Sequence, residues 1–139
     1  MPLHTTTLEL YIHEDSEIID ITRQIQEELS GSPFNDGMLT VFVPGSNGGV
    51  MTLEMEPDLE RDLEKAFERW ASEMASRRVG LSRHGGNGRR GALAALVGPS
   101  LSVPFRDGLL DLGSRQQIAF VDFDSRPRKR VLILQIMGE

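Results

Sequence analysis

The chain has 139 residues, of which 39% are hydrophobic, no cysteine and a net charge of −6 at pH 7. This length and composition predict a single domain, residues 1–139, with an ordinary hydrophobic core. The absence of cysteine excludes disulfides, thiol catalysis and thiolate metal sites, and it suits the reducing cytoplasm, where we expect the protein. No apolar run reaches the roughly 18 residues that span a membrane, no signal-peptide pattern is visible, and the acidic balance disfavours nucleic-acid binding.

The charges are divided unevenly along the chain. Residues 1–75 carry 16 Asp and Glu against 4 Lys and Arg, a net of −12, whereas residues 76–139 carry 5 against 11, a net of +6. A solvated acidic helix or complementary subunit faces would explain this division. These explanations are favoured over the functional one, an anion site built from the second half of the chain.

The first half predicts strands around one helix. Alternating apolar residues predict a strand over residues 4–13. A helix follows from Thr22, its expected N-cap, to Gly31, its expected stop. A continuous apolar run over residues 38–43 predicts a central buried strand, and another strand is expected over residues 50–53.

The longest predicted element is a helix over residues 57–75. Pro57 suits its first position, and the carboxylates of Asp58 and Asp62 are expected to face water. Its apolar residues recur at helical spacing and form one stripe: Leu59, Leu63, Phe67, Trp70, Ala71 and Met74.

Two glycine-rich segments have alternative interpretations. Residues 44–49, PGSNGG, predict either a hairpin loop or a loop whose N–H groups approach a ligand closely. Residues 76–90 contain 4 glycines and 5 arginines, too many glycines for a regular helix or strand. They form either a surface linker or a loop that presents arginines and main-chain donors to phosphate or carboxylate.

The C-terminal part predicts a short helix over residues 93–97 and then strands. A two-residue turn at residues 107–108 predicts a hairpin. Further strands are expected over residues 118–123 and 131–137, the latter buried on both faces by its composition. Their connection, residues 124–130, carries four cations and is interpreted as a solvated turn.

The order of elements predicts an α+β fold: a compact single domain whose mixed or largely antiparallel sheet is covered by two main helices. No standard catalytic motif is present. The histidines, His4, His13 and His84, are too dispersed for a metal site, so no metal is expected and any cofactor is unknown.

From Leu39 to the C-terminus the chain resembles the YjbQ-like family, also described as secondary thiamine-phosphate synthases. The matching segments keep their order: TVFVP at 40–44, GVMTLEMEPDLERDL at 49–63, GN at 86–87, LVGPSLSVPFRDG at 96–108, GSRQQIAFVDFD at 113–124 and RKRVLILQIMGE at 128–139. The resemblance implies a compact α+β fold, a homotrimer, and a pocket where polar residues of three motifs converge. It also implies weak thiamine-phosphate synthase activity, with cation or N–H donors around the substrate phosphates.

The chain departs from the family at several of these motif positions. Gly45 and Gly91 stand where the family has histidines, and Leu93 stands where it has a lysine. Leu53 replaces an asparagine and Arg115 a tryptophan. Glycine cannot transfer protons, ligate a metal or donate from a side chain to an anion, so histidine-based chemistry of the family type is not expected.

Three hypotheses follow. The first is a divergent, catalytically weakened homotrimer that binds a small anionic or phosphorylated ligand through Arg89, Arg90 and Arg115. Asn87 and Gln116 would orient this ligand, and Glu54 and His84 would remain as a titratable pair. The second is an active transferase of the secondary thiamine-phosphate synthase type, and the third is a structural or interaction protein without a ligand.

Overall fold

The computed structural model describes residues 2–13, 17–77, 87–124 and 128–139; of Glu17, residues 75–77 and residues 87–90 only the backbone is described. All pairings of the described strands are antiparallel, and three helices accompany them. This confirms the α+β class. The strands do not form the single sheet that was predicted, however, because they divide into two sheets, of five strands and three strands.

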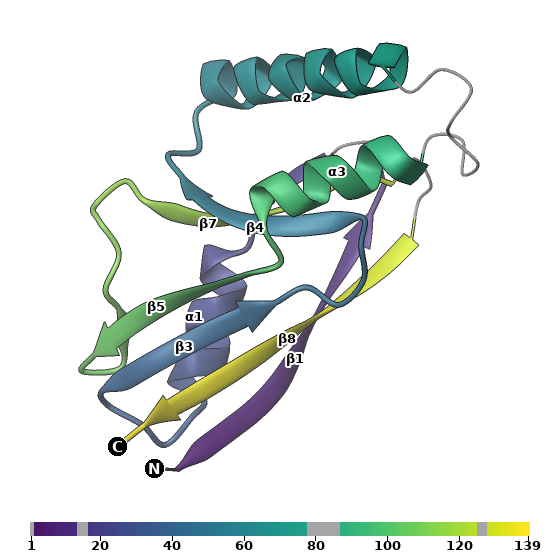
Figure 1. Cartoon of the computed structure of the whole chain (residues 1–139). Coiled ribbons are helices and arrows are strands. Elements are labelled where there is room, and N and C mark those ends of the chain that lie inside the picture. Colours follow the sequence, from purple (N-terminus) through teal and green to yellow (C-terminus); the bar gives the residue numbers. More distant parts are fainter. Residues whose placement is uncertain (1, 14–16, 78–86, 125–127) are drawn as a thin grey trace.

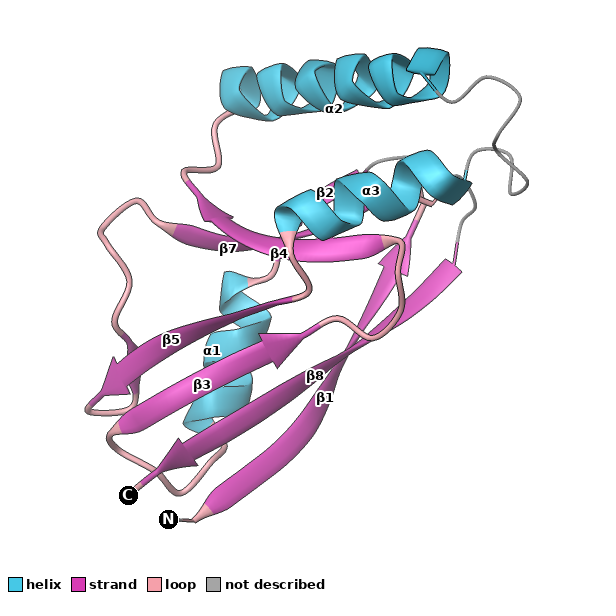
Figure 2. Cartoon of the chain, in the orientation of Figure 1, coloured by secondary structure: helices cyan, strands magenta, loops and turns pink. Residues whose placement is uncertain are grey.

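The larger sheet has the order β1-β8-β3-β5-β6 (Figures 1 and 2). Its strands are β1 (Leu3–Ile12), β8 (Arg128–Gly138), β3 (Gly37–Phe42), β5 (Ser100–Arg106) and β6 (Leu109–Leu110). The hairpin of β5 and β6 turns at Asp107 and Gly108, with φ of 53° and 76°. Two positive φ angles are what a two-residue hairpin loop requires, which confirms the predicted turn.

The smaller sheet has the order β2-β7-β4. Its strands are β2 (Glu17–Asp20), β7 (Gln117–Asp122) and β4 (Gly48–Leu53). Because β3 and β4 lie in different sheets and do not pair, residues 44–47 are a crossover between the sheets, and Gly48 and Gly49 belong to β4. The prediction of a hairpin loop there is wrong.

Helix α1 (Thr22–Ser30) packs Ile25 and Leu29 into the core between the sheets. The predicted N-cap at Thr22 is wrong, because Ile21 occupies that position without a side-chain cap bond. The Asp20 carboxylate supplies the missing acceptor: its Oδ1 accepts hydrogen bonds from Thr22 N at 3.0 Å and Thr22 Oγ1 at 2.7 Å.

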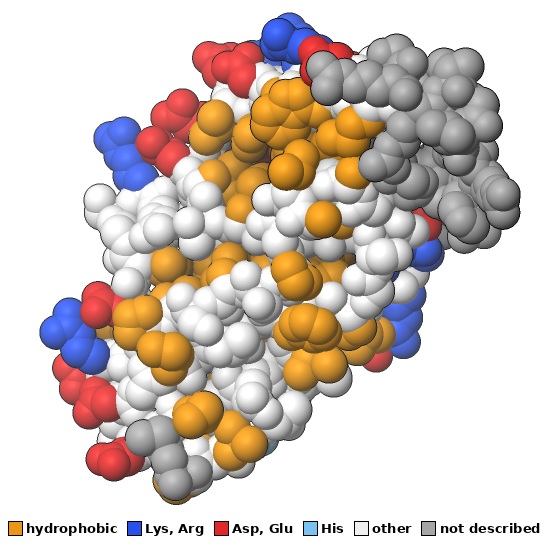
Figure 3. Space-filling model, viewed as in Figure 1, with side chains coloured by type: hydrophobic (Ala, Val, Ile, Leu, Met, Phe, Trp, Pro, Cys, Tyr) orange, Lys and Arg blue, Asp and Glu red, His pale blue; other side chains and the backbone are white. Residues whose placement is uncertain are grey.

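Helix α2 (Pro57–Arg77) lies over helix α3 (Asn87–Val97) and is separated from the larger sheet (Figure 1). Phe67 is the buried residue of its described apolar stripe, and its ring packs edge-to-face on Phe123 with centroids 5.1 Å apart. Trp70 remains 43% exposed. Figure 3 shows apolar side chains gathered where these two helices meet.

Helix α3 begins at Asn87, earlier than the predicted start at residue 93. Residues 87–90 are therefore helical, and the prediction that the whole glycine-rich segment lacks regular structure is wrong for them. Residues 78–86 lie outside the described residues.

The larger sheet has one buried face and one uncovered face. Leu39, Leu132 and Leu134 are fully buried against α1 and the smaller sheet. The opposite face is uncovered in Figure 1 and carries partly exposed apolar side chains, among them Met38, Phe42, Val131 and Met137. The predicted burial of residues 131–137 on both faces is therefore wrong within this chain. Residues 38–43 form a central strand, as predicted, between β8 and β5, but Met38 and Phe42 are exposed.

Candidate functional site

The crossover of residues 44–47 lies against helix α3. A Cβ atom placed on Gly91 would lie 3.9 Å from the main-chain oxygen of Ser46, and one on Gly45 would lie 3.6 Å from Nη1 of Arg130. Asn47 holds the crossover to the smaller sheet, because its main-chain oxygen accepts a hydrogen bond from Phe123 N at 2.8 Å. The structure thus brings Gly45 and Gly91 to the same crossover.

Gly45 has a φ of +100°, a conformation that L side chains rarely adopt. Gly91 is helical, and a Cβ there would make only an ordinary van der Waals contact, with Ser46 O at 3.9 Å. The two glycines therefore differ. The backbone at Gly45 is shaped for glycine, whereas Gly91 sits in a backbone that other residues adopt without strain.

An ionic cluster lies beside this crossover and was not predicted. Asp122 is completely buried, and Arg130 donates two hydrogen bonds to it: Nε to Oδ2 at 2.7 Å and Nη2 to Oδ1 at 3.2 Å. Asp124 is 3% exposed, and its main-chain N donates to Asp122 Oδ1 at 2.8 Å. Arg128 Nη1 lies 2.5 Å from Asp124 Oδ2.

This cluster corrects the interpretation of residues 124–130 as a solvated turn. Arg128 and Arg130 neutralise two buried carboxylates, and the Arg130 side chain is only 11% exposed. Lys129 points to the uncovered face, where it pairs with Glu9 at 3.1 Å. Arg126 lies outside the described residues.

The alternation of side chains along a strand could have predicted this cluster from the sequence. Asp122 ends β7 and Asp124 lies two residues beyond it, and Arg128 and Arg130 are two residues apart at the start of β8. Residues spaced by two share one face of a strand. Two acids and two bases at that spacing, on either side of a short connection, were sufficient to suggest pairing.

The remaining predicted site residues divide into two groups. Glu54 and Arg115 form an ion pair at 3.2 Å, with side chains 41% and 79% exposed, respectively. Such an exposed pair contributes at most about 1 kcal/mol. Gln116 closes its own turn, accepting a hydrogen bond from Gly113 N at 3.0 Å.

The second group begins helix α3. Asn87, Arg89 and Arg90 lie in its first turn, close in sequence to Gly91, and their side chains are outside the described residues, as is His84. The six residues of β4 separate the crossover from Glu54, a span of about 20 Å at 3.3 Å per residue. One chain therefore does not bring the two groups together.

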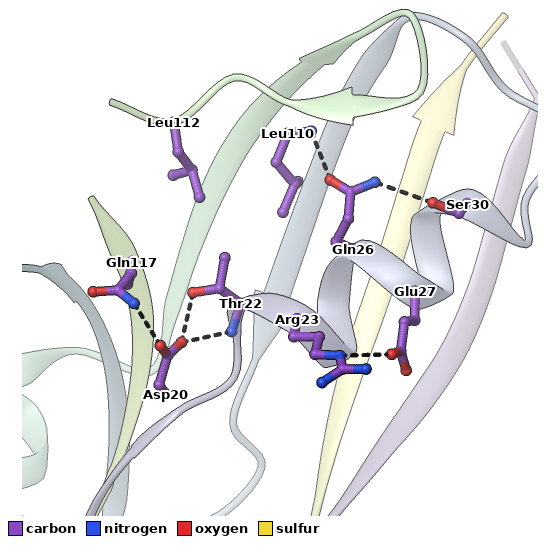
Figure 4. Close-up of a pocket in the computed structure, with 9 residues that line it drawn as sticks. All are labelled: Asp20, Thr22, Arg23, Gln26, Glu27, Ser30, Leu110, Leu112 and Gln117. Atoms are coloured by element: carbon purple, nitrogen blue, oxygen red, sulfur yellow. Dashed lines mark hydrogen bonds and ion pairs between the residues drawn. The ribbon is translucent and has the colours of Figure 1, made fainter. Parts of the chain in front are cut away.

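A separate hollow of about 650 Å³ lies between α1 and residues 110–117 (Figure 4). Its polar side chains hydrogen-bond within the protein: Gln26 Oε1 accepts from Leu110 N at 3.0 Å, and Gln117 Nε2 donates to Asp20 Oδ2 at 2.7 Å. The first bond ties α1 to β6, and the second ties β7 to β2, so the hollow contains structural bridges.

Within the described residues, no group of three or more His, Asp or Glu side chains is placed to hold a metal ion. The same residues contain no helix long and apolar enough to cross a membrane.

The fold and the crossover define a small α+β protein with two antiparallel sheets. The family model described as "UPF0047 protein YjbQ-like" matches residues 6–139, so the chain belongs to the YjbQ-like family. The UPF0047 protein YugU of Bacillus subtilis is 31% identical over 137 residues, which cover 95% of this chain and 98% of YugU. A UPF0047 protein of Methanothermobacter thermautotrophicus is 32% identical over 139 residues, covering 100% of this chain and 95% of that protein.

Solved structures share the fold. The hypothetical protein APE1520 of Aeropyrum pernix superposes with a TM-score of 0.85 at 27% identity, covering 98% of this chain and 99% of that one. An uncharacterized conserved YjbQ/UPF0047 protein of Clostridium acetobutylicum gives a TM-score of 0.82 at 30% identity, covering 95% of this chain and 99% of that one. The family resemblance and the compact α+β fold predicted from the sequence are both confirmed.

Proposed function

We propose that this protein is a catalytically weakened, homotrimeric YjbQ-like protein that binds a small anionic or phosphorylated ligand between residues 44–47 and the start of helix α3. The observation that carries the proposal is the meeting of Gly45, Gly91 and Arg130 at one crossover. Arg130 presents Nη1 there while its charge is balanced by Asp122, so in the proposal Arg89 and Arg90 supply the cations of the site, and both imidazoles of the family pattern are lacking. Such a site can hold a negative charge without transferring protons.

The first turn of α3 favours the binding of an anion. Its main-chain N–H groups have no partners within the helix, and the helix dipole places partial positive charge at this end. The turn contains no acidic residue and includes Arg89 and Arg90, whose charges oppose the dipole. A bound phosphate would relieve the repulsion between the arginines and the dipole, and it would accept hydrogen bonds from the main-chain N–H groups.

Glu54 follows the far end of β4, and Arg115 pairs with it there, so these two residues and the neighbouring Gln116 do not reach this ligand within one chain. In the proposal they reach it only when a neighbouring subunit supplies them. The uncovered sheet face supports self-association, because it exposes apolar side chains at several adjacent strand positions, including Met38 and Met137, which are paired in register (Figure 3).

Calorimetric titration with pyrophosphate and thiamine phosphate tests the ligand. We expect saturable heat at millimolar ligand, and about thirtyfold weaker binding for the Arg89→Ala/Arg90→Ala variant, because the two lost charge-assisted contacts remove on the order of 1 kcal/mol each. Arg69→Ala, at an exposed position of α2, is the matched control. The absence of saturable heat would contradict the proposal.

Light scattering tests the assembly. Three chains of 15.5 kDa give a mass of about 46 kDa. A monomer at micromolar concentration would contradict the trimer.

The alternative functions predict different outcomes. An active thiamine-phosphate synthase would release pyrophosphate at a rate that Gly91→His leaves unchanged, whereas a weakened site gains activity from the restored imidazole. A structural protein would show altered assembly or partner binding on charge reversal at Arg89 and Arg90, with no small-molecule affinity to lose.

A further inference from the structure

A second, chemically different cleft lies where the two sheets diverge. The sheets touch at one end, where Val50 N donates to Gly98 O at 3.0 Å. From there β4 and β5 separate, and the segment that connects β6 with β7 closes the wide end (Figure 1). The cleft between them has a volume of about 430 Å³ and is lined by both strands and by Asp111, Leu112 and Gln116. This volume suits a small molecule.

The edge of β4 directs main-chain groups into the cleft. Val50 N points away from β7, because it bonds to Gly98. In an antiparallel ladder the N–H and C=O groups of residues two apart point to the same side. Thr52, two residues further on, therefore directs its N–H and C=O towards β5, and none of the described main-chain hydrogen bonds outside the ladders involves it.

The edge of β5 does the same from the opposite wall. Pro104 O accepts a hydrogen bond from Asp111 N at 2.9 Å, so the groups of Pro104 point away from β3. Ser102, two residues earlier, points its N–H and C=O in the same direction, towards β4. Pro104 has no N–H, and this side of the strand is where a proline fits, because no ladder bond is needed there.

The remaining lining excludes an anion and provides apolar walls. Asp111 is the charged residue among those that line the cleft, and it is paired with Arg106 at 3.0 Å. A phosphate would meet this carboxylate and no unpaired cation. Val50, Leu101 and Leu112 contribute apolar surface, which suits the faces of a flat ring.

We infer that the cleft between β4 and β5 binds a small, planar, neutral molecule whose rim carries an adjacent hydrogen-bond donor and acceptor, an amide or an amino-heterocycle, through the main-chain groups of Thr52 and Ser102. Two facing strand edges recognise such a rim as they would the next strand of a sheet. The inference does not rest on the proposed anion site, because its binding groups, the main chain of Thr52 and Ser102, take no part in that site and its ligand carries no charge.

The experiment uses benzamide as the probe, with benzoate and acetophenone as probes of similar size, and follows the main-chain amide signals of the full chain by NMR. We expect millimolar benzamide to shift the Thr52 and Ser102 signals in a saturable manner. Benzoate should bind at least about tenfold more weakly, because it brings a charge and no donor, and acetophenone should also be weaker, because it has no N–H to donate.

Two variants distinguish the contribution of the Thr52 main chain to binding from that of its side chain. Thr52→Pro removes the N–H that points into the cleft and spares the ladder to β7, so we expect about tenfold weaker binding of benzamide. Thr52→Val keeps that N–H and should bind within a factor of about three of the parent. If Thr52→Pro does not fold, Thr52→Trp fills the mouth of the cleft from the same position and should abolish binding.

Three results would overturn the inference: equal binding of benzamide and benzoate, shifts confined to another part of the protein, or protection of the Thr52 amide from hydrogen exchange in the free protein. The last result would mean that a second copy of the chain already occupies this edge. Failure of pyrophosphate binding would leave the benzamide result unaffected, so the two sites are tested independently.

Discussion

Arg130 holds Asp122 through two hydrogen bonds, from Nε to Oδ2 at 2.7 Å and from Nη2 to Oδ1 at 3.2 Å, and the Asp122 side chain has no exposed surface. The guanidinium thereby presents its third nitrogen, Nη1, towards Gly45. One arginine both neutralises a buried charge and forms the wall of the crossover.

Loss of this arginine should therefore destabilise the fold. Arg130→Met leaves the buried Asp122 carboxylate without its principal partner, and such a loss costs about 3–5 kcal/mol. Urea unfolding measures it. The exposed pair of Arg23 and Glu27 is the control, and Arg23→Met should cost less than about 1 kcal/mol. The double variant Asp122→Asn/Arg130→Met should recover part of the loss; no recovery would mean that the pair is not coupled.

The two glycines at family histidine positions should respond differently to histidine. Gly45→His places a side chain on a backbone with a φ of +100°, which costs roughly 1–3 kcal/mol. Gly91→His replaces a helical glycine whose Cβ would meet no atom closer than 3.9 Å, and should be neutral or stabilising by up to about 1 kcal/mol. Thermal unfolding of the two variants checks this. Equal destabilisation would contradict it.

Gly49 should be intolerant of any side chain. A Cβ there would lie 2.7 Å from Gly98 O and 2.8 Å from Val97 Cγ1. Gly98 O is main-chain and accepts the Val50 hydrogen bond, so it cannot move aside without breaking the contact between the sheets.

We therefore expect Gly49→Ala to cost about 1–3 kcal/mol in unfolding free energy, the usual range for overpacking. Gly31→Ala is the control. Its Cβ would lie no closer than 3.6 Å to other atoms, and its φ of −79° is ordinary, so its effect should be below about 1 kcal/mol.

The sequence predicted those features that depend on neighbours in the chain. The periodicity of residues 57–75, the turn at Asp107 and Gly108, and most strand positions were confirmed. The division into two sheets could not be predicted, because β4 pairs with β7, which follows it only after two helices and two strands. Apolar composition also cannot distinguish a core from an uncovered face, so Val131 and Met137 were wrongly predicted to be buried.

The candidate site was predicted only in part, because it too depends on which strands lie side by side. Arg115 meets Glu54, yet the crossover lies at the other end of β4. The cations of residues 128–130 looked solvated because their partners, Asp122 and Asp124, were interpreted as part of a strand and its connection. Spacing by two on each side of that connection was the available signal.

The ammonium group of Lys129 should titrate above its ordinary range. A hydrogen bond and charge attraction from Glu9, 3.1 Å away, raise the pKa of Lys129 above 10.5. A raised pKa means that the pair contributes stability at neutral pH, and that this contribution is lost as the pH rises through the raised pKa. Because the Lys129 and Glu9 side chains are about half exposed, the effect on unfolding should be small and should weaken with salt.

Carbon-detected NMR titration of the Lys129 side chain measures this pKa directly. Glu9→Gln removes the charge and should lower the Lys129 pKa towards 10.5, whereas Glu27→Gln, whose carboxylate pairs with Arg23, should leave it unchanged. If Glu9→Gln has no effect, the pair does not form in solution. A Lys129 pKa that falls below 10.5 on trimer formation would instead indicate that a neighbouring subunit buries this end of the uncovered sheet face, because burial disfavours the charged ammonium.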